Sequence, residues 1–164
     1  MRTASDIQIT GNVTPTFERL IRNCLDKFPT WFVKAARISK IEVKNTPEIR
    51  AQVAMYEHGT RNLYVCPGVG DLLQKAIGHE LAHACDDIFE MPHFFSAVPQ
   101  WQLIHRNQMH FDIPKYQEQP LEYFADMVVK LFMLGPQKLS TTNPQEVMFI
   151  NSWVFPLLQK HFGQ

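Results

Sequence analysis

The residues best suited to chemistry in this 164-residue chain are His79, Glu80 and His83, which form the pattern His-Glu-x-x-His. Apolar residues recur around them with helical spacing, so we expect both imidazoles on one helix face, one turn apart. Two imidazoles in that arrangement suit a zinc ion, and Glu80 then lies close enough to a zinc-bound water to act as a general base. The pattern predicts a zinc hydrolase, and most specifically a peptidase.

The alternative is a helix that carries this pattern by coincidence, which the seven histidines of the chain make easier. The small or apolar neighbours Leu81, Ala82 and Ala84 and the amphipathic character of the segment favour the metal site.

A catalytic zinc ion usually has three protein ligands and one open position, so a third ligand must come from elsewhere in the chain. Metzincin spacing is excluded because Asp86 and Phe89 stand where that class has glycine and histidine. The remaining downstream candidates are His93, His105, His110, Asp112 and Glu122.

Glu122 is the best of these candidates because it lies on a second apolar helix that can pack against the first. Asp126 follows one helical turn later, so one carboxylate can bind zinc while the other accepts a hydrogen bond from a ligating histidine. The alternative for Glu122 is an acid in the first helical turn, where the helix dipole favours it.

Two further acids, Asp86 and Asp87, follow His83 by three and four residues. Either could accept the free ring N–H of a ligating histidine, and we favour Asp87 because it is four residues from His83. The alternative is an acidic patch on an exposed helix end.

Hydrophobic periodicity predicts helices over about 17–28, 71–89, 120–134 and 144–161, and strands over about 36–44, 51–57 and 62–66. The stretch 92–119 has no clear period, so we expect a functional loop or short helices there. We therefore expect one α+β domain over 1–164, with a short three-stranded sheet packed on the His-Glu-x-x-His helix and additional C-terminal helices.

Composition narrows the classes of partner. Sixteen basic and sixteen acidic residues balance, so charge gives no argument for nucleic acid or an anionic membrane as a partner. There is no apolar run of about 18 residues and no apolar signal segment, so we expect a cytoplasmic protein as synthesised, with export by a non-classical route left open. An odd count of three cysteines, Cys24, Cys66 and Cys85, predicts buried free thiols and a reducing compartment.

Three separate pieces of the sequence resemble one known family. Residues 79–87 read HELAHACDD, residues 122–126 read EYFAD, and Phe149-Ile150-Asn151 follows. Over roughly residues 60–155 the chain resembles the catalytic domain of anthrax toxin lethal factor and its relatives, which include proline-specific bacterial endopeptidases. The resemblance implies a small gluzincin-like zincin fold with Glu122 as the third zinc ligand. It also implies that Tyr116 stabilises the oxyanion, although Tyr116 stands one residue closer to Glu122 than the family's tyrosine does.

The predicted reaction is zinc-dependent hydrolysis of internal bonds in a peptide or protein, with an extended substrate along an edge strand from within 51–66. We expect a monomer. Two other readings stay open: an inactive zincin-fold binding module, against which the retained Glu80 argues, and a zinc hydrolase of a non-peptide substrate.

Overall fold

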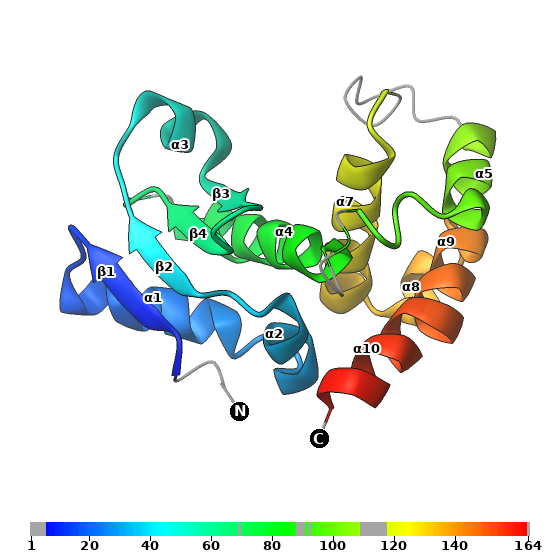
Figure 1. Ribbon diagram of the computed structural model, residues 1–164, viewed down its shortest axis with the longest axis horizontal. Coiled ribbons are helices and arrows are strands. Elements are labelled where there is room, and N and C mark those ends of the chain that lie inside the picture. The colour runs from blue at the N-terminus through cyan, green and yellow to red at the C-terminus, as the bar shows by residue number, and fades with distance from the viewer. Residues whose placement is uncertain (1–5, 69, 88–90, 92, 109–117, 164) are drawn as a thin grey trace.

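The strands in the first half of the chain form a small sheet, and the helices of the second half lie to one side of it (Figure 1). The computed structural model describes residues 6–68, 70–87, 91, 93–108 and 118–163. The fold is mixed α+β, as the sequence predicts. The main hydrophobic core runs from the sheet through the central helix to the C-terminal helices. A second, small cluster consists of Ile49, Tyr64 and Cys66.

The sheet has four strands in the order β1-β2-β4-β3. Their bounds are β1 Gln8–Gly11, β2 Lys40–Val43, β3 Ala54–Glu57 and β4 Asn62–Val65. β2 pairs in parallel with β1 and β4, whereas β3 pairs antiparallel to β4. β3 is therefore an edge strand of the sheet.

The expected count of three strands is wrong, because β1 was missed. Its four residues, Gln-Ile-Thr-Gly, carry too little alternation to stand out, and their partner β2 lies about 30 residues further along the chain. Two predicted strands also begin too early. The helix α2, Thr30–Ala36, occupies the start of the first, and the helix α3, Pro47–Gln52, occupies the start of the second.

The helix α1 spans Pro15–Leu25, and the Thr14 side chain accepts a hydrogen bond from the Phe17 N–H at its start. Of its predicted apolar face, Ile21, Cys24 and Leu25 are buried, whereas Leu20 is 37% exposed. The other two cysteines, Cys66 and Cys85, are buried free thiols as well, which confirms the predicted burial.

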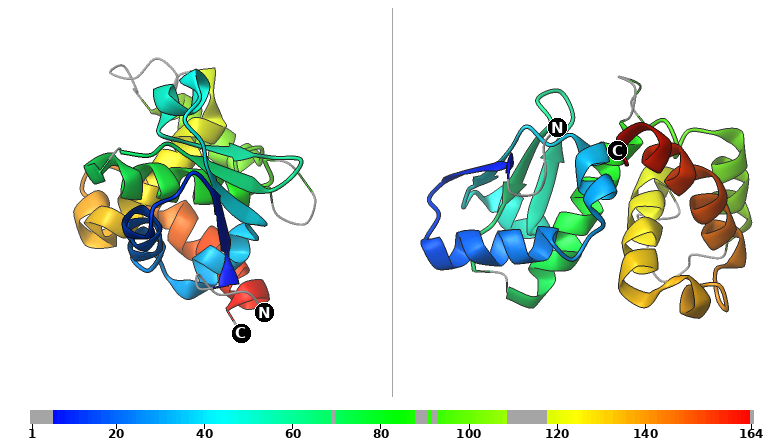
Figure 2. Two further views of the ribbon diagram at one scale, coloured as in Figure 1. Left: turned by 90° about the vertical axis from the view of Figure 1, so that its left-hand side faces the viewer. Right: turned by 90° about the horizontal axis from the view of Figure 1, so that it is seen from below.

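The helix α4, Leu73–Asp86, follows a 3-10 turn at Gly70–Leu72 and lies at the centre of the fold. It contacts β3, α1 and α2 on one side and α7 on the other (Figure 2). Four of its five predicted buried positions are buried, namely Leu73, Ile77, Leu81 and Cys85. The fifth, Ile88, lies outside the described residues.

Gly78 lets α4 approach its neighbours closely. A Cβ atom at Gly78 would lie 2.5 Å from Cζ of Phe28 and 3.2 Å from Cγ2 of Val129. Glycine is therefore needed here for space, in the middle of a helix where it is otherwise unfavourable.

Arg61 fixes the C-terminal end of α4. Its guanidinium donates hydrogen bonds to the carbonyl oxygens of Ala36 (2.8 Å), Ala84 (3.0 Å) and Asp87 (3.1 Å). These carbonyls lie at the ends of α2 and α4, where a cation complements the helix dipole. One side chain thus holds two helix ends together.

The C-terminal part is helical. Its elements are α5 Pro99–Asn107, α7 Pro120–Leu134, α8 Pro136–Leu139, α9 Pro144–Phe149, a π-helical turn at Ile150–Val154 and α10 Phe155–Phe162. α7 has the predicted bounds, and α5 is a short helix within the aperiodic stretch. The predicted last helix is present, but its regular pattern is interrupted by the π-helical turn. That turn precedes Pro156, which has no N–H for an α-helical hydrogen bond.

Within the described ranges, no helix combines the length and the apolar character that crossing a bilayer requires.

Candidate metal centre

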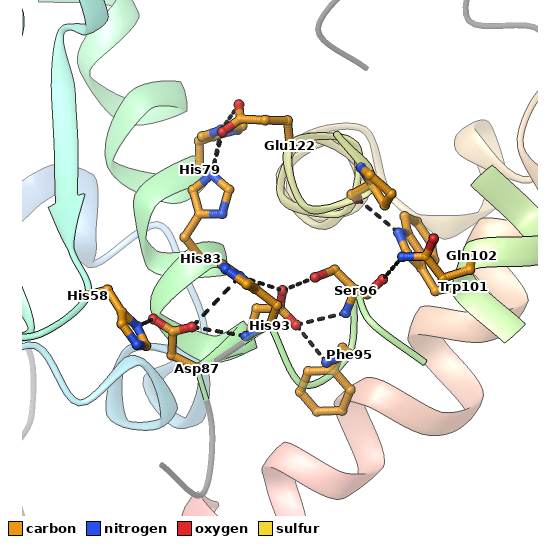
Figure 3. A network of polar contacts seen from close by, with 12 residues as sticks. His58, His79, His83, Asp87, His93, Phe95, Ser96, Trp101, Gln102 and Glu122 are labelled. Carbon is orange, nitrogen blue, oxygen red and sulfur yellow. Dashed lines mark hydrogen bonds and ion pairs between the residues drawn. The ribbon is translucent and has the colours of Figure 1, made fainter. Parts of the chain in front are cut away.

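His79 and His83 on α4 face Glu122 on α7 (Figure 3). The Nε2 atoms of the two histidines are 3.1 Å apart. Glu122 places Oε2 3.2 Å from Nε2 of His79 and Oε1 3.3 Å from Nε2 of His83. The sequence predicts these three residues, and the structure brings them together. His79 and Glu122 are 43 residues apart in the sequence and lie on different helices.

The fold positions each side chain for a local reason. The two histidines share a face of α4 because they are four residues apart. Glu122 lies in the first turn of α7, and the indole N–H of Trp101 donates to the carbonyl of Pro120 at 3.0 Å, which fixes the start of that helix. Direct packing of α4 on α7 then brings Glu122 to the imidazoles.

The donor set fits a zinc ion. Donor atoms 2.0–2.1 Å from a tetrahedral ion are about 3.3 Å apart. The two Nε2 atoms are 3.1 Å apart, and each lies within 3.3 Å of one of the two Glu122 oxygens. The side chains of His79, His83 and Glu122 are only 13%, 12% and 20% exposed, so they are partly withdrawn from bulk water. In the part of the chain that the structure describes, this is the only group of three such side chains with donor atoms within 4.8 Å of one another. Imidazole with carboxylate is a ligand set typical of zinc.

The electrostatics reflect how close these groups lie. Burial lowers the pKa of His83, but its hydrogen bond to Glu122 and the charges of Glu80 and Glu122 outweigh that effect, so the pKa is raised overall. The two carboxylates thus favour positive charge at His83, as a site for a cation requires.

Glu80 lies beside this cluster but takes no part in it. Its Oε2 accepts a hydrogen bond of 2.8 Å from the backbone N–H of Tyr56 on β3. Burial raises the pKa of the Glu80 carboxyl, and the nearby His83 and His79 offset part of that rise. The carboxylate is thus held between the candidate metal ligands and the edge strand.

A cleft of about 700 Å³ contains the cluster. Residues of α4 form its floor, β3 with the residues before it forms one wall, and the segment from Gln119 to Glu122 with Asp126 forms the other. Two lining residues have strained backbones, Val53 with φ 71° and His93 with φ 56°. Strain of this kind concentrates at functional sites.

The two acids after His83, Asp86 and Asp87, have different hydrogen-bond partners. Asp86 is fully buried and accepts hydrogen bonds from the backbone N–H groups of Phe95 (2.6 Å) and Ser96 (2.9 Å) and from the Ser96 hydroxyl. Asp86 therefore holds the segment after the helix.

Asp87 lines the cleft. It is hydrogen-bonded to Nδ1 of His58 and accepts the backbone N–H of His93 at 3.1 Å. Its predicted role as a partner of His83 stays a prediction. The contact with His58 could not be predicted from the sequence, because His58 lies in a turn 29 residues earlier.

Asp126 is 1% exposed and forms ion pairs with Lys75 at 3.3 Å and Lys130 at 2.7 Å. Lys75 is on α4, so this contact bridges the two helices that carry the three candidate metal ligands. The predicted hydrogen bond from a ligating histidine to Asp126 stays a prediction.

Two other candidate ligands are described and lie outside the cluster. His93 is near Asp86 and Asp87, and His105 is buried on α5 beside the ring of Tyr123. The candidates His110 and Asp112, the candidate oxyanion residue Tyr116 and the predicted helix end at Phe89 lie outside the described residues.

No family model, no curated protein and no solved structure matches the chain. The functional argument therefore depends on the residues of the site.

Proposed function

We propose that the protein is a zinc-dependent endopeptidase. The observation that carries the proposal is the convergence of His79, His83 and Glu122 on one point of a cleft, with the separate carboxylate of Glu80 beside them. Hydrolytic zinc sites have three protein ligands and a nearby carboxylate that does not bind the metal, whereas structural zinc sites have four protein ligands.

A zinc ion held by His79, His83 and Glu122 would lower the pKa of a bound water and polarise a substrate carbonyl. The protein's own contribution to the proton transfers is Glu80. Its carboxylate accepts a proton from the attacking water and later passes it to the leaving amine. The Tyr56 N–H restrains Glu80, so that the base stays close to the reacting atoms without binding the metal itself.

An extended peptide is the substrate that best suits this cleft. β3 is at the edge of the sheet and contacts α4 directly, so the open edge runs alongside the metal centre. A peptide that pairs with an edge strand obtains main-chain hydrogen bonds without regard to sequence. In this proposal the α+β domain is a small zincin-like fold of the gluzincin type.

The test is digestion of a synthetic peptide library by the purified, zinc-loaded protein, with products identified by mass spectrometry. We expect cleavage at internal bonds, its loss after treatment with a chelator and its return when zinc is added. Zinc binding without any peptide cleavage would contradict the proposal and favour a binding module or a hydrolase of another substrate class.

A further inference from the structure

Two charged residues in line with the candidate metal ligands of α4, Lys75 and Asp87, have no part in the proposed chemistry. Lys75, His79, His83 and Asp87 follow one another at four-residue intervals, and all four line the cleft. The candidate metal centre therefore lies between a lysine on one side and an aspartate on the other. The inference below rests on the proposed peptidase function and concerns its substrates.

Lys75 contributes positive charge to its end of the cleft. Its side chain is 52% exposed, with Nζ 3.3 Å from Oδ1 of Asp126. Asp126 also pairs with Lys130, whose Nζ is 2.7 Å from Oδ2. One carboxylate between two ammonium groups leaves one positive charge in excess. Of the two lysines, Lys75 is the one that lines the cleft.

Leu72, Ala76 and Leu121 add apolar surface to the cleft that Lys75 and Asp126 also line. Apolar surface in a cleft reduces the screening of nearby charges by water. The Lys75 side chain is 52% exposed, so a substrate carboxylate in the cleft can reach its ammonium group.

Two contacts fix the direction of the cleft. Tyr56 on β3 bonds to Glu80 on α4, and His58, just after β3, bonds to Asp87, just after α4. β3 and α4 therefore run in the same direction. A peptide that pairs antiparallel to β3, the commoner arrangement for strand pairs, runs from the Asp87 end toward the Lys75 end.

Lys75 comes one helical turn before His79, about 6 Å along the axis, which is roughly two residues of an extended peptide. We infer that Lys75 is a specificity-determining residue that binds a carboxylate on the C-terminal side of the scissile bond. The carboxylate is either an Asp or Glu side chain within about two residues of that bond or the terminal carboxylate of a short product.

The experiment starts from one peptide that the zinc-loaded protein cleaves. Each derivative carries Asp or Asn at one position, chosen from the two positions before and the two positions after the scissile bond. Each derivative is made once with a free C-terminus and once with an amidated C-terminus. kcat and KM are measured for the wild type, for Lys75→Gln and for Lys130→Gln. Lys130 is the matched control because it pairs with the same Asp126 without lining the cleft.

We expect the wild type to prefer a carboxylate C-terminal to the bond by about 10-fold in kcat/KM, mainly through KM. Lys75→Gln should abolish the preference and Lys130→Gln should retain it. A side-chain carboxylate is the ligand if Asp outperforms Asn, and a terminal carboxylate is the ligand if amidation lowers cleavage.

Cleavage without this preference, a preference on the N-terminal side only, or a preference that survives Lys75→Gln would overturn the inference and leave the peptidase proposal intact. Failure of the protein to cleave any peptide would overturn both.

Discussion

Glu80 is held differently from the three side chains that converge on the candidate zinc site. His79, His83 and Glu122 contact one another, whereas Glu80 bonds to the backbone of β3. A residue that acts as the base without binding the metal should be separable from the ligands by mutation.

We predict that Glu80→Gln retains zinc and the fold but loses peptide hydrolysis by at least about 100-fold, because a neutral amide cannot accept the proton. Zinc content by elemental analysis and kcat/KM on one peptide test this. Glu48→Gln makes the same chemical change at an exposed position outside the cleft and should leave both unchanged. Wild-type turnover in Glu80→Gln, or loss of its zinc, would show that the role is misassigned.

Glu122 and Asp126 are one turn apart on α7 and should respond differently to substitution. Glu122→Ala removes a ligand and should abolish stable zinc binding. Asp126→Asn should weaken zinc binding by only about 10–100-fold, the cost expected for the predicted hydrogen-bond partner of a ligating histidine. Competition titration with a chromophoric chelator measures both affinities. Equal losses in the two variants, or a larger loss in Asp126→Asn, would be inconsistent with Glu122 as the ligand.

At the scale of elements, α4 depends on close packing at Gly78. Alanine is a better helix former than glycine by about 1 kcal/mol, yet its Cβ would lie 2.5 Å from the ring of Phe28, which packs against Phe32 and Phe132. We predict that Gly78→Ala lowers the free energy of unfolding by about 1–3 kcal/mol in urea denaturation.

Gly59→Ala provides the control for Gly78→Ala, because a Cβ at Gly59 meets nothing within 4 Å. Its unfolding free energy should stay within about 0.5 kcal/mol of the wild type. If Gly78→Ala is as stable as Gly59→Ala, the close approach of α4 to its neighbours is less tight than described.

The elements that the sequence predicted well are those with strong periodicity. α7 has its predicted bounds, and α4 buries its predicted stripe. α3 was missed although Thr46 and Pro47 form a helix start, because six residues are too few to show a period. β1 was missed because its pairing with β2 is distant in sequence.

At the scale of the whole molecule, the candidate site forms where β3 and α7 pack on α4. The candidate metal ligands His79, His83 and Glu122 could be predicted from the sequence, because their residue types and helical spacing are those of a zinc site. The hydrogen bond of Tyr56 to Glu80, the contact of His58 with Asp87 and the ion pair of Lys75 with Asp126 could not. These contacts join segments far apart in the chain, and they arise only from packing of β3 and α7 on α4.

The most direct test of the central claim is anomalous diffraction at the zinc absorption edge, from crystals of the zinc-loaded protein. We predict one strong peak per chain, bonded to Nε2 of His79, Nε2 of His83 and a carboxylate oxygen of Glu122 at about 2.0–2.2 Å. A peak at His58 and His93, a third ligand other than Glu122, or no peak between α4 and α7 would contradict the account.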